Sequence, residues 1–181
     1  MGIVLMLAAW NHWSIKSQDV TCAFLKSKPI QRNVFVKPPP ERRIPGIIWK
    51  LKKTVYGLAD ASRGFYLNFS ENLMNKGCIK SKMDPAMFIH FGSSSSEHEK
   101  EPCGVAVTHV DNVLSTGDEV FSKTVIDALK KDFKFGSEEE CEFRYLGLNV
   151  VQSQDGIEIE NNHYIEAMEH PNMDVADKFK S

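Results

Sequence analysis

A short polar interruption between two runs of β-branched and apolar residues constrains this chain more than any other feature. The interruption contains His109, Asp111 and Asn112 and lies within residues 107–114. Such runs are typical of strands, and polar residues between two of them are typical of a tight hairpin turn. The sequence therefore predicts a hairpin that presents Asp111 at its tip. A carboxylate held in this way is a rigid metal ligand, although an ordinary turn residue is the simpler interpretation of the motif taken alone.

A second acidic residue follows an alternating stretch near the N-terminus. Asp19 ends this stretch, and the aromatic residue Phe24 comes five positions later. On its own, Asp19 is also interpretable as a helix N-cap. Because Mg²⁺ prefers carboxylates together with phosphate oxygens, Asp19 and Asp111 can serve one site only if their strands are neighbours.

The remaining periodicity predicts an alternation of helices and strands. We expect helices at 3–11, at 59–76 with Gly77 closing it, and after a capping box at 116–119; we expect strands at 13–16, 47–52, 86–91, 103–116, 143–152 and 157–160. Residues 92–101 are expected to form a mobile loop, and the tail from residue 171 to be frayed. This order predicts an α+β fold with helices on one face of an antiparallel sheet.

Composition excludes several classes of protein. A chain of 181 residues with 42% hydrophobic content can form one domain with a real core. The four cysteines form no CxxC pair, which argues against a zinc site and a disulfide framework. The apolar N-terminus lacks a basic region and is too short for a membrane span. We therefore expect a cytoplasmic or nuclear protein with no membrane partner.

Charge is distributed unevenly. Residues 137–181 contain 11 acidic and 3 basic residues, whereas the rest of the chain contains 13 acidic and 19 basic residues. Basic residues concentrate between residues 37 and 63. This concentration can follow a phosphate backbone, although a solvated loop is the simpler interpretation of the charges alone.

Seven segments within residues 3–165 resemble motifs of the reverse transcriptases of Ty1/copia-type retrotransposons, and they occur in the order that this family has. The segments around Asp19 and Asp111 resemble motifs A and C. The others are NVFVKPPP at 33–40, WKLKKTVYGL at 49–58, ASRGFY at 61–66, DPAMF at 84–88 and FRYLGL at 143–148. Each is weak alone, but the ordered set is specific.

The resemblance implies an RNA-directed DNA polymerase palm, with a remnant of the fingers, over residues 1–165 and a thumb stub or disordered tail at 166–181. It implies two-metal nucleotidyl transfer with Mg²⁺ or Mn²⁺, an RNA or DNA template-primer and deoxynucleotides. The catalytic residues would be Asp19, Asp111 and Asn112, and the metal ligands Asp19, Val20 and Asp111. The substrate-binding residues would be Phe24, Tyr56, Gly57 and Arg63, and the nucleic-acid-binding residues Lys50, Lys52 and Lys53.

The chain departs from the family pattern at several positions. His109-Val110-Asp111-Asn112 stands where the family has Tyr-Val-Asp-Asp, and Ala59-Asp60 stands where it has Lys-Gln. The family's basic fingers segment would precede residue 3. We therefore expect a fragment of a Pol polyprotein with weak or absent activity. The alternative is a catalytically silent, exapted palm that binds nucleic acid or a protein.

Overall fold

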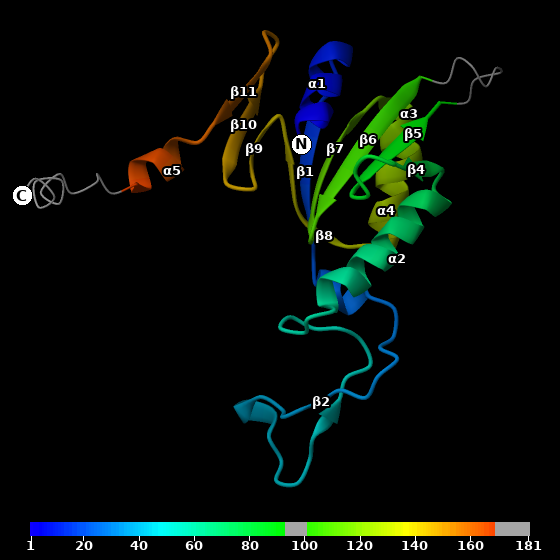
Figure 1. Ribbon diagram of the computed structural model, residues 1–181, viewed down its shortest axis with the longest axis vertical. Coiled ribbons are helices and arrows are strands. Elements are labelled where there is room, and N and C mark those ends of the chain that lie inside the picture. The colour runs from blue at the N-terminus through cyan, green and yellow to red at the C-terminus, as the bar shows by residue number, and fades with distance from the viewer. Residues whose placement is uncertain (93–100, 169–181) are drawn as a thin grey trace, which may run out of the picture.

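A six-stranded antiparallel sheet forms the centre of the computed structural model, which describes residues 1–92 and 101–168 (Figure 1). Its strands follow the order β4-β5-β6-β7-β1-β8. They are β1 (Ile15–Val20), β4 (Cys78–Lys80), β5 (Met87–Phe91), β6 (Pro102–His109), β7 (Asn112–Gly117) and β8 (Phe135–Glu140). The predicted hairpin of β6 and β7 is confirmed, and its turn consists of Val110 and Asp111.

Helices cover both faces of this sheet (Figure 1). One face carries α2 (Ala61–Asn75) and a continuous helix made of α3 (Glu119–Phe121), the π-helical η4 (Ser122–Ile126) and α4 (Asp127–Asp132). The opposite face carries α1 (Gly2–Asn11), which buries Val4, Leu5 and Ala8 in a separate core. The α+β class and the antiparallel sheet are confirmed, but the prediction of helices on one face was wrong for α1. Successive strand residues point to opposite faces, and both faces of this sheet are apolar.

A small three-stranded sheet covers the same face as α1. It consists of β9 (Glu142–Tyr145), β10 (Leu148–Gln152) and β11 (Ile157–Glu160). The strand predicted at 143–152 is instead broken by a turn at Leu146 and Gly147, whose φ angles of 52° and 87° no continuous strand allows. The hairpin predicted around Asp155-Gly156 is confirmed. The short helix α5 (Asn162–Ala167) then leads away from the body (Figure 1).

The ends of the helices were predicted with mixed success. Gly77 follows α2 with a φ of 86°, as expected for a left-handed cap. The helix after β7 is capped by Asp118, which accepts a hydrogen bond from Phe121 N at 2.8 Å. Thr116, the expected first residue of a capping box, lies in β7 instead. Most of the expected mobile loop and the tail from residue 171 lie outside the described residues. No helix within the described ranges is long and apolar enough to cross a bilayer.

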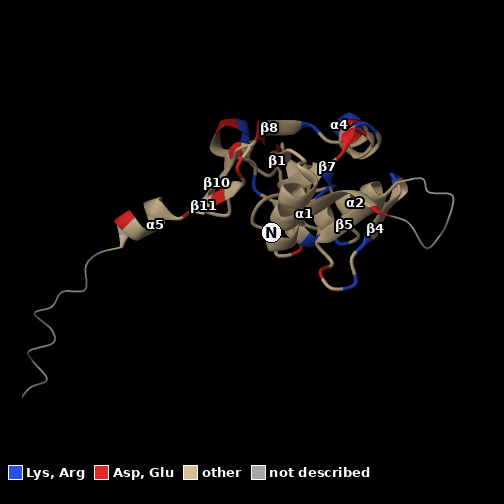
Figure 2. Cartoon of the chain, turned by 90° about the horizontal axis from the view of Figure 1, so that it is seen from above, with Lys and Arg blue, Asp and Glu red and all other residues tan. Residues whose placement is uncertain are grey.

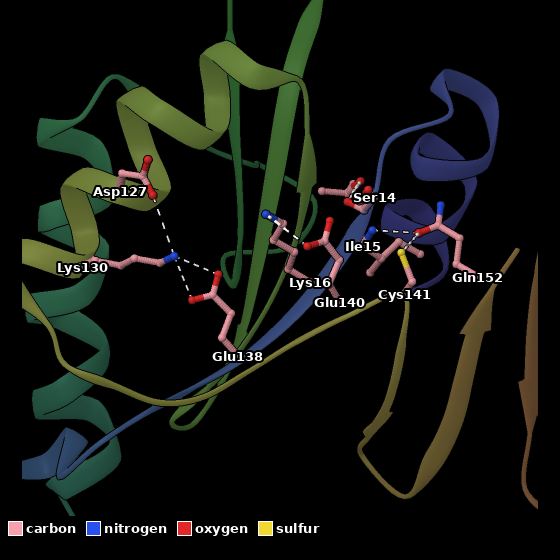
Figure 3. A network of polar contacts seen from close by, with 10 residues as sticks. Ser14, Ile15, Lys16, Asp127, Lys130, Glu138, Glu140, Cys141 and Gln152 are labelled. Carbon is pink, nitrogen blue, oxygen red and sulfur yellow. Dashed lines mark hydrogen bonds and ion pairs between the residues drawn. The ribbon is translucent and has the colours of Figure 1, made fainter.

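The edge strand β8 was not predicted, because its acidic sequence carries little strand propensity. It pairs with β1 through the main chain, and charges from neighbouring elements offset its glutamates. Lys130 of α4 binds Glu138 at 2.8 Å, and Lys16 of β1 binds Glu140 at 3.6 Å (Figure 3). Basic and acidic residues of α4 and β8 accordingly lie near one another at one side of the molecule (Figure 2).

An arm projects from the body between β1 and α2 (Figure 1). It begins after the 3-10 helix η1 (Ala23–Lys26) and contains β2 (Phe35–Val36), the 3-10 helix η2 (Pro40–Arg42) and β3 (Trp49–Lys50). The strand predicted at 47–52 is therefore confirmed only at its centre. Every residue from 39 to 50 is exposed, including Ile44, Ile47, Ile48 and Trp49. The arm consequently offers apolar and basic side chains together.

Candidate active site

The two acidic residues singled out in the sequence meet at one end of the central sheet. Asp19 lies in β1 directly opposite Asn112, the first residue of β7. The main-chain N–H of Val20 donates a hydrogen bond to the carbonyl oxygen of Asp111 at 2.9 Å. Residues that face each other in this way have Cα atoms only about 5 Å apart. The interpretation of Asp19 as a helix N-cap is wrong, because the residue lies within a strand and Cys22 precedes η1.

The surroundings of Asp19 disfavour its negative charge. Partial burial and, second, the charge of Asp111 raise the pKa of the Asp19 carboxyl above its usual value. Strand β8 has two residues, Gly136 and Ser137, opposite Asp19 of β1, and they form a bulge. A Cβ atom at Gly136 would lie 2.8 Å from Thr21 Oγ1 and 3.5 Å from Asp19 Oδ2. Glycine at position 136 therefore avoids a clash with Thr21 where β8 runs beside Asp19, a feature that the sequence prediction missed.

Two aromatic residues lie beside the carboxylates. The rings of Phe24 and Tyr56 have centroids 4.3 Å apart at an interplanar angle of 60°. Buried Thr54 fixes the loop that carries Tyr56, because Thr54 Oγ1 donates to the carbonyl oxygen of Phe24 at 2.7 Å. Thr54 N also donates to Ser27 Oγ at 3.1 Å. These two bonds bring residues about 30 positions apart in sequence to one site.

Tyr56 contacts the candidate catalytic residues directly. Its hydroxyl donates a hydrogen bond to Asp111 Oδ2 at 3.0 Å. That bond raises the pKa of the Tyr56 phenol, and desolvation and the charges of Asp111 and Asp19 add to the effect. Gly57 follows with a φ of 92°, a conformation that favours glycine. The structure thus brings Asp19, Asp111, Asn112, Phe24, Tyr56 and Gly57 together.

The turn between β6 and β7 supplies polar neighbours to Asp111. Asn112 Nδ2 donates to Asp111 Oδ1 at 3.4 Å, so the amide N–H faces the carboxylate. His109 is exposed at the end of β6 and lines the same hollow as Asp111. Val110 occupies the turn with a φ of 55°, an uncommon conformation for a β-branched residue. The turn is therefore held in a strained geometry beside the candidate site.

The turn between β9 and β10 forms the other wall of this hollow and was missed as a part of the site. Arg144, Leu146 and Gly147 face Asp111 and Tyr56 across a cleft of about 560 Å³. Arg144 is exposed and brings a positive charge to this wall. The FRYLGL motif indicated this segment, but no signal in one sequence shows that its turn reaches the carboxylates. That placement depends on the packing of the small sheet against the body.

The other predicted residues lie elsewhere. Arg63 lines a separate hollow on α2 with Arg32 and Asp60. Asp60 itself is paired with Arg32, whose Nη2 and Nε donate to its two oxygens at 2.8 and 3.2 Å. This ion pair offsets the negative charge of Asp60. The three lysines between residues 50 and 53 lie on the exposed side of the arm and its base. The functional roles of Arg63 and these lysines stay predictions.

The donor set at this end of the sheet fits a hard divalent cation. Two carboxylates and a nearby amide oxygen are ligands that Mg²⁺ accepts, and Mg²⁺ keeps several waters. The electrostatic penalty on Asp19 is one that a cation would relieve. Val20, also expected as a ligand, has only its carbonyl oxygen for this role. Within the described residues no group of three or more histidine, cysteine, aspartate or glutamate side chains forms a denser metal site.

Comparison with known proteins shows the family to which the chain is similar. The family model described as reverse transcriptase (RNA-dependent DNA polymerase) matches residues 1–178. The chain is 28% identical over 166 residues, 90% of its length, to the Retrovirus-related Pol polyprotein from transposon RE2 of Arabidopsis thaliana, and 28% identical over 167 residues to that from transposon RE1. It is 26% identical over 152 residues, 81% of its length, to the Transposon Ty1-MR1 Gag-Pol polyprotein of Saccharomyces cerevisiae.

The chain spans only 11% of the RE1 and RE2 polyproteins and 8% of the Ty1-MR1 polyprotein. The order of motifs in the sequence, the antiparallel sheet and the match over residues 1–178 nevertheless lead to one assignment. The chain belongs to the reverse transcriptase family, as a domain of the Ty1/copia type.

Proposed function

We propose that this chain is the palm region of an RNA-directed DNA polymerase and that Asp19 and Asp111 hold its divalent cations. The observation that carries the proposal is the meeting of these two residues at one end of β1 and β7. They come from segments 92 positions apart, and a structural role alone does not require two carboxylates at one place. The proposed substrates are a template-primer and a deoxynucleotide.

The residues around the carboxylates have side chains that would serve the separate steps of nucleotidyl transfer. Bound divalent cations would activate the primer 3′-hydroxyl and stabilise the leaving pyrophosphate. The Phe24 ring is buried against the loop at 54–56, where it would limit space at the 2′ position of the sugar. Arg144 on the opposite wall would hold a primer phosphate. The basic arm would contact the template backbone without reading bases.

One observation favours weak catalysis in this chain and supports the second candidate function, a silent palm that binds nucleic acid. Asn112 presents an amide N–H to Asp111 in place of a second charged oxygen, and this weakens the attraction for a cation. The exposed arm, with basic and apolar side chains, is independent of these carboxylates and would keep its affinity for nucleic acid.

Primer extension tests the proposal. The chain would be assayed on poly(rA)/oligo(dT) with Mg²⁺ and with Mn²⁺, beside Asp111→Ala. We expect weak extension that Mn²⁺ enhances and that Asp111→Ala abolishes. Extension unchanged in Asp111→Ala would contradict the assignment of the site. If no extension occurs, binding of the same duplex by fluorescence anisotropy distinguishes the silent module from a protein that binds no nucleic acid.

A further inference from the structure

The side chain of Tyr56 spans the gap between Asp111 and Phe24. Its hydroxyl donates to Asp111 Oδ2 at 3.0 Å, and its ring lies against Phe24 with the centroids 4.3 Å apart. The residue is nevertheless 67% exposed. Two contacts at opposite ends therefore fix a residue that the core does not hold.

The hydroxyl occupies space that a cation would need. Asp111 Oδ2 accepts from Tyr56, while Oδ1 faces the Asn112 amide at 3.4 Å. Both oxygens of the carboxylate are thus directed at neutral donors. A Mg²⁺ ion has to approach a carboxylate oxygen to about 2 Å and brings a shell of water with it. The phenol also lies within the electrostatic influence of Asp19, so it sits near both negative charges.

The main chain beside Tyr56 permits a movement of the ring. Gly57 has a φ of 92°, and among the described residues no atom outside its two chain neighbours lies within 4 Å of the position of a Cβ at this residue. Tyr56 and Gly57 are both exposed, whereas Thr54 two residues earlier is buried and anchored to Phe24. The ring can therefore turn while the base of the loop stays in place.

We propose that Tyr56 is a gate on the acidic pair: its hydroxyl holds Asp111 in the cation-free chain, and a divalent cation binds when the ring turns away. This inference rests on the proposed function, since it assumes that Asp19 and Asp111 bind a cation. Tyr56 also forms part of the hollow next to Cys22, Phe24 and Leu25. The same movement therefore reshapes the surface where the sugar of the nucleotide would lie, and it couples binding of the cation to binding of the nucleotide.

Isothermal titration with Mn²⁺ tests the gate through the variant Tyr56→Phe. This change removes the hydroxyl and keeps the ring that packs on Phe24. One hydrogen bond to a carboxylate in an exposed setting is worth about 1 kcal/mol, so we expect Mn²⁺ to bind roughly three- to tenfold more tightly. The matched control is Tyr66→Phe, which removes a hydroxyl that donates to the Pro85 carbonyl oxygen at 2.7 Å, and it should leave the affinity unchanged.

Near-ultraviolet difference absorbance of tyrosine gives a second measurement that does not depend on activity. Addition of Mg²⁺ should change the tyrosine signal of the wild type and of Tyr66→Phe, and not that of Tyr56→Phe. Mn²⁺ binding by Tyr56→Phe that is equal to or weaker than that of the wild type would refute the proposed gate, while the proposed metal site would stand. Mn²⁺ binding that is absent from all variants, or that persists unchanged in Asp111→Ala, would instead overturn the proposed function together with the gate.

Discussion

Two facing glycines make room for the ring of Phe121, and filling one of them should destabilise the fold. Gly104 of β6 pairs with Gly117 of β7. A Cβ at Gly104 would lie 2.1 Å from Phe121 Cγ, far inside the usual 3.5–4.0 Å between carbon atoms. Phe121 is 1% exposed and its N–H is bound by Asp118, so the ring has little room to retreat.

The expected loss of stability in Gly104→Ala follows from the overlap of its Cβ with the Phe121 ring. Overpacking a core in this way costs about 1–3 kcal/mol, and the small gain from replacing glycine by alanine does not apply where the new side chain cannot fit. We expect Gly104→Ala to lower the free energy of unfolding by about 2–3 kcal/mol. For a chain of this length each kcal/mol shifts Tm by roughly 2–4 °C, so Tm should fall by roughly 4–12 °C.

Urea denaturation followed by circular dichroism measures the effect. Gly92→Ala is the matched control, since no atom of the described residues outside its chain neighbours lies within 4 Å of its Cβ position, and it should change stability by less than about 0.5 kcal/mol. Phe121→Leu provides a double-mutant cycle in which the smaller side chain should relieve part of the loss caused by Gly104→Ala. A loss below about 0.5 kcal/mol for Gly104→Ala, or no coupling between the two positions, would refute the packing argument.

Three further predictions concern a buried phenol, the metal site and the arm. The Tyr145 hydroxyl is buried without a hydrogen-bond partner among the described residues, and burial raises its pKa to about 12 from a usual 10.0. Because the pKa of Tyr145 is higher in the folded than in the unfolded state, the contribution of this phenol to stability is present below pH 10 and is lost as the pH rises through 12. In denaturation measured across that range, Tyr145→Phe should not show this loss of stability. Asn112→Asp should tighten Mn²⁺ binding in calorimetry, because it supplies a charged oxygen next to Asp111; unchanged affinity would show that position 112 does not face the cation. Nucleic-acid binding measured by anisotropy should be weak and salt-sensitive, and it should be lost when the three lysines between residues 50 and 53 are replaced by glutamate. The logarithm of the binding constant should fall with the logarithm of the salt concentration, with a slope of about 0.9 per neutralised phosphate on duplex. Sub-micromolar binding at physiological salt would contradict this prediction.

The sequence predicted those helices and strands whose conformation depends on their own residues. The hairpin carrying Asp111 and the helix closed by Gly77 follow from strand propensity, helical spacing and glycine at a left-handed position. No local pattern in the sequence indicated the acidic edge strand β8, because this strand forms only through its hydrogen bonds to the neighbouring strand β1. Tertiary pairing overrode propensity there.

The candidate site was only partly predictable for the same reason. Asp19, Asp111, Phe24 and Tyr56 were found because they stand within ordered motifs. Arg144 was missed as a site residue, because its proximity to Asp111 depends on the packing of a second sheet. The hydrogen bond between Tyr56 and Asp111 joins residues 55 positions apart and has no signature in a single sequence.

The central claim is that Asp19 and Asp111 bind divalent cations at the end of β1 and β7. A crystal of the chain soaked in Mn²⁺ tests it most directly, because the anomalous signal of manganese identifies the ion. We expect an anomalous peak about 2 Å from carboxylate oxygens of both residues, with the Tyr56 hydroxyl moved away from Asp111. Manganese bound only elsewhere, with the hydrogen bond between Tyr56 and Asp111 intact, would contradict the account.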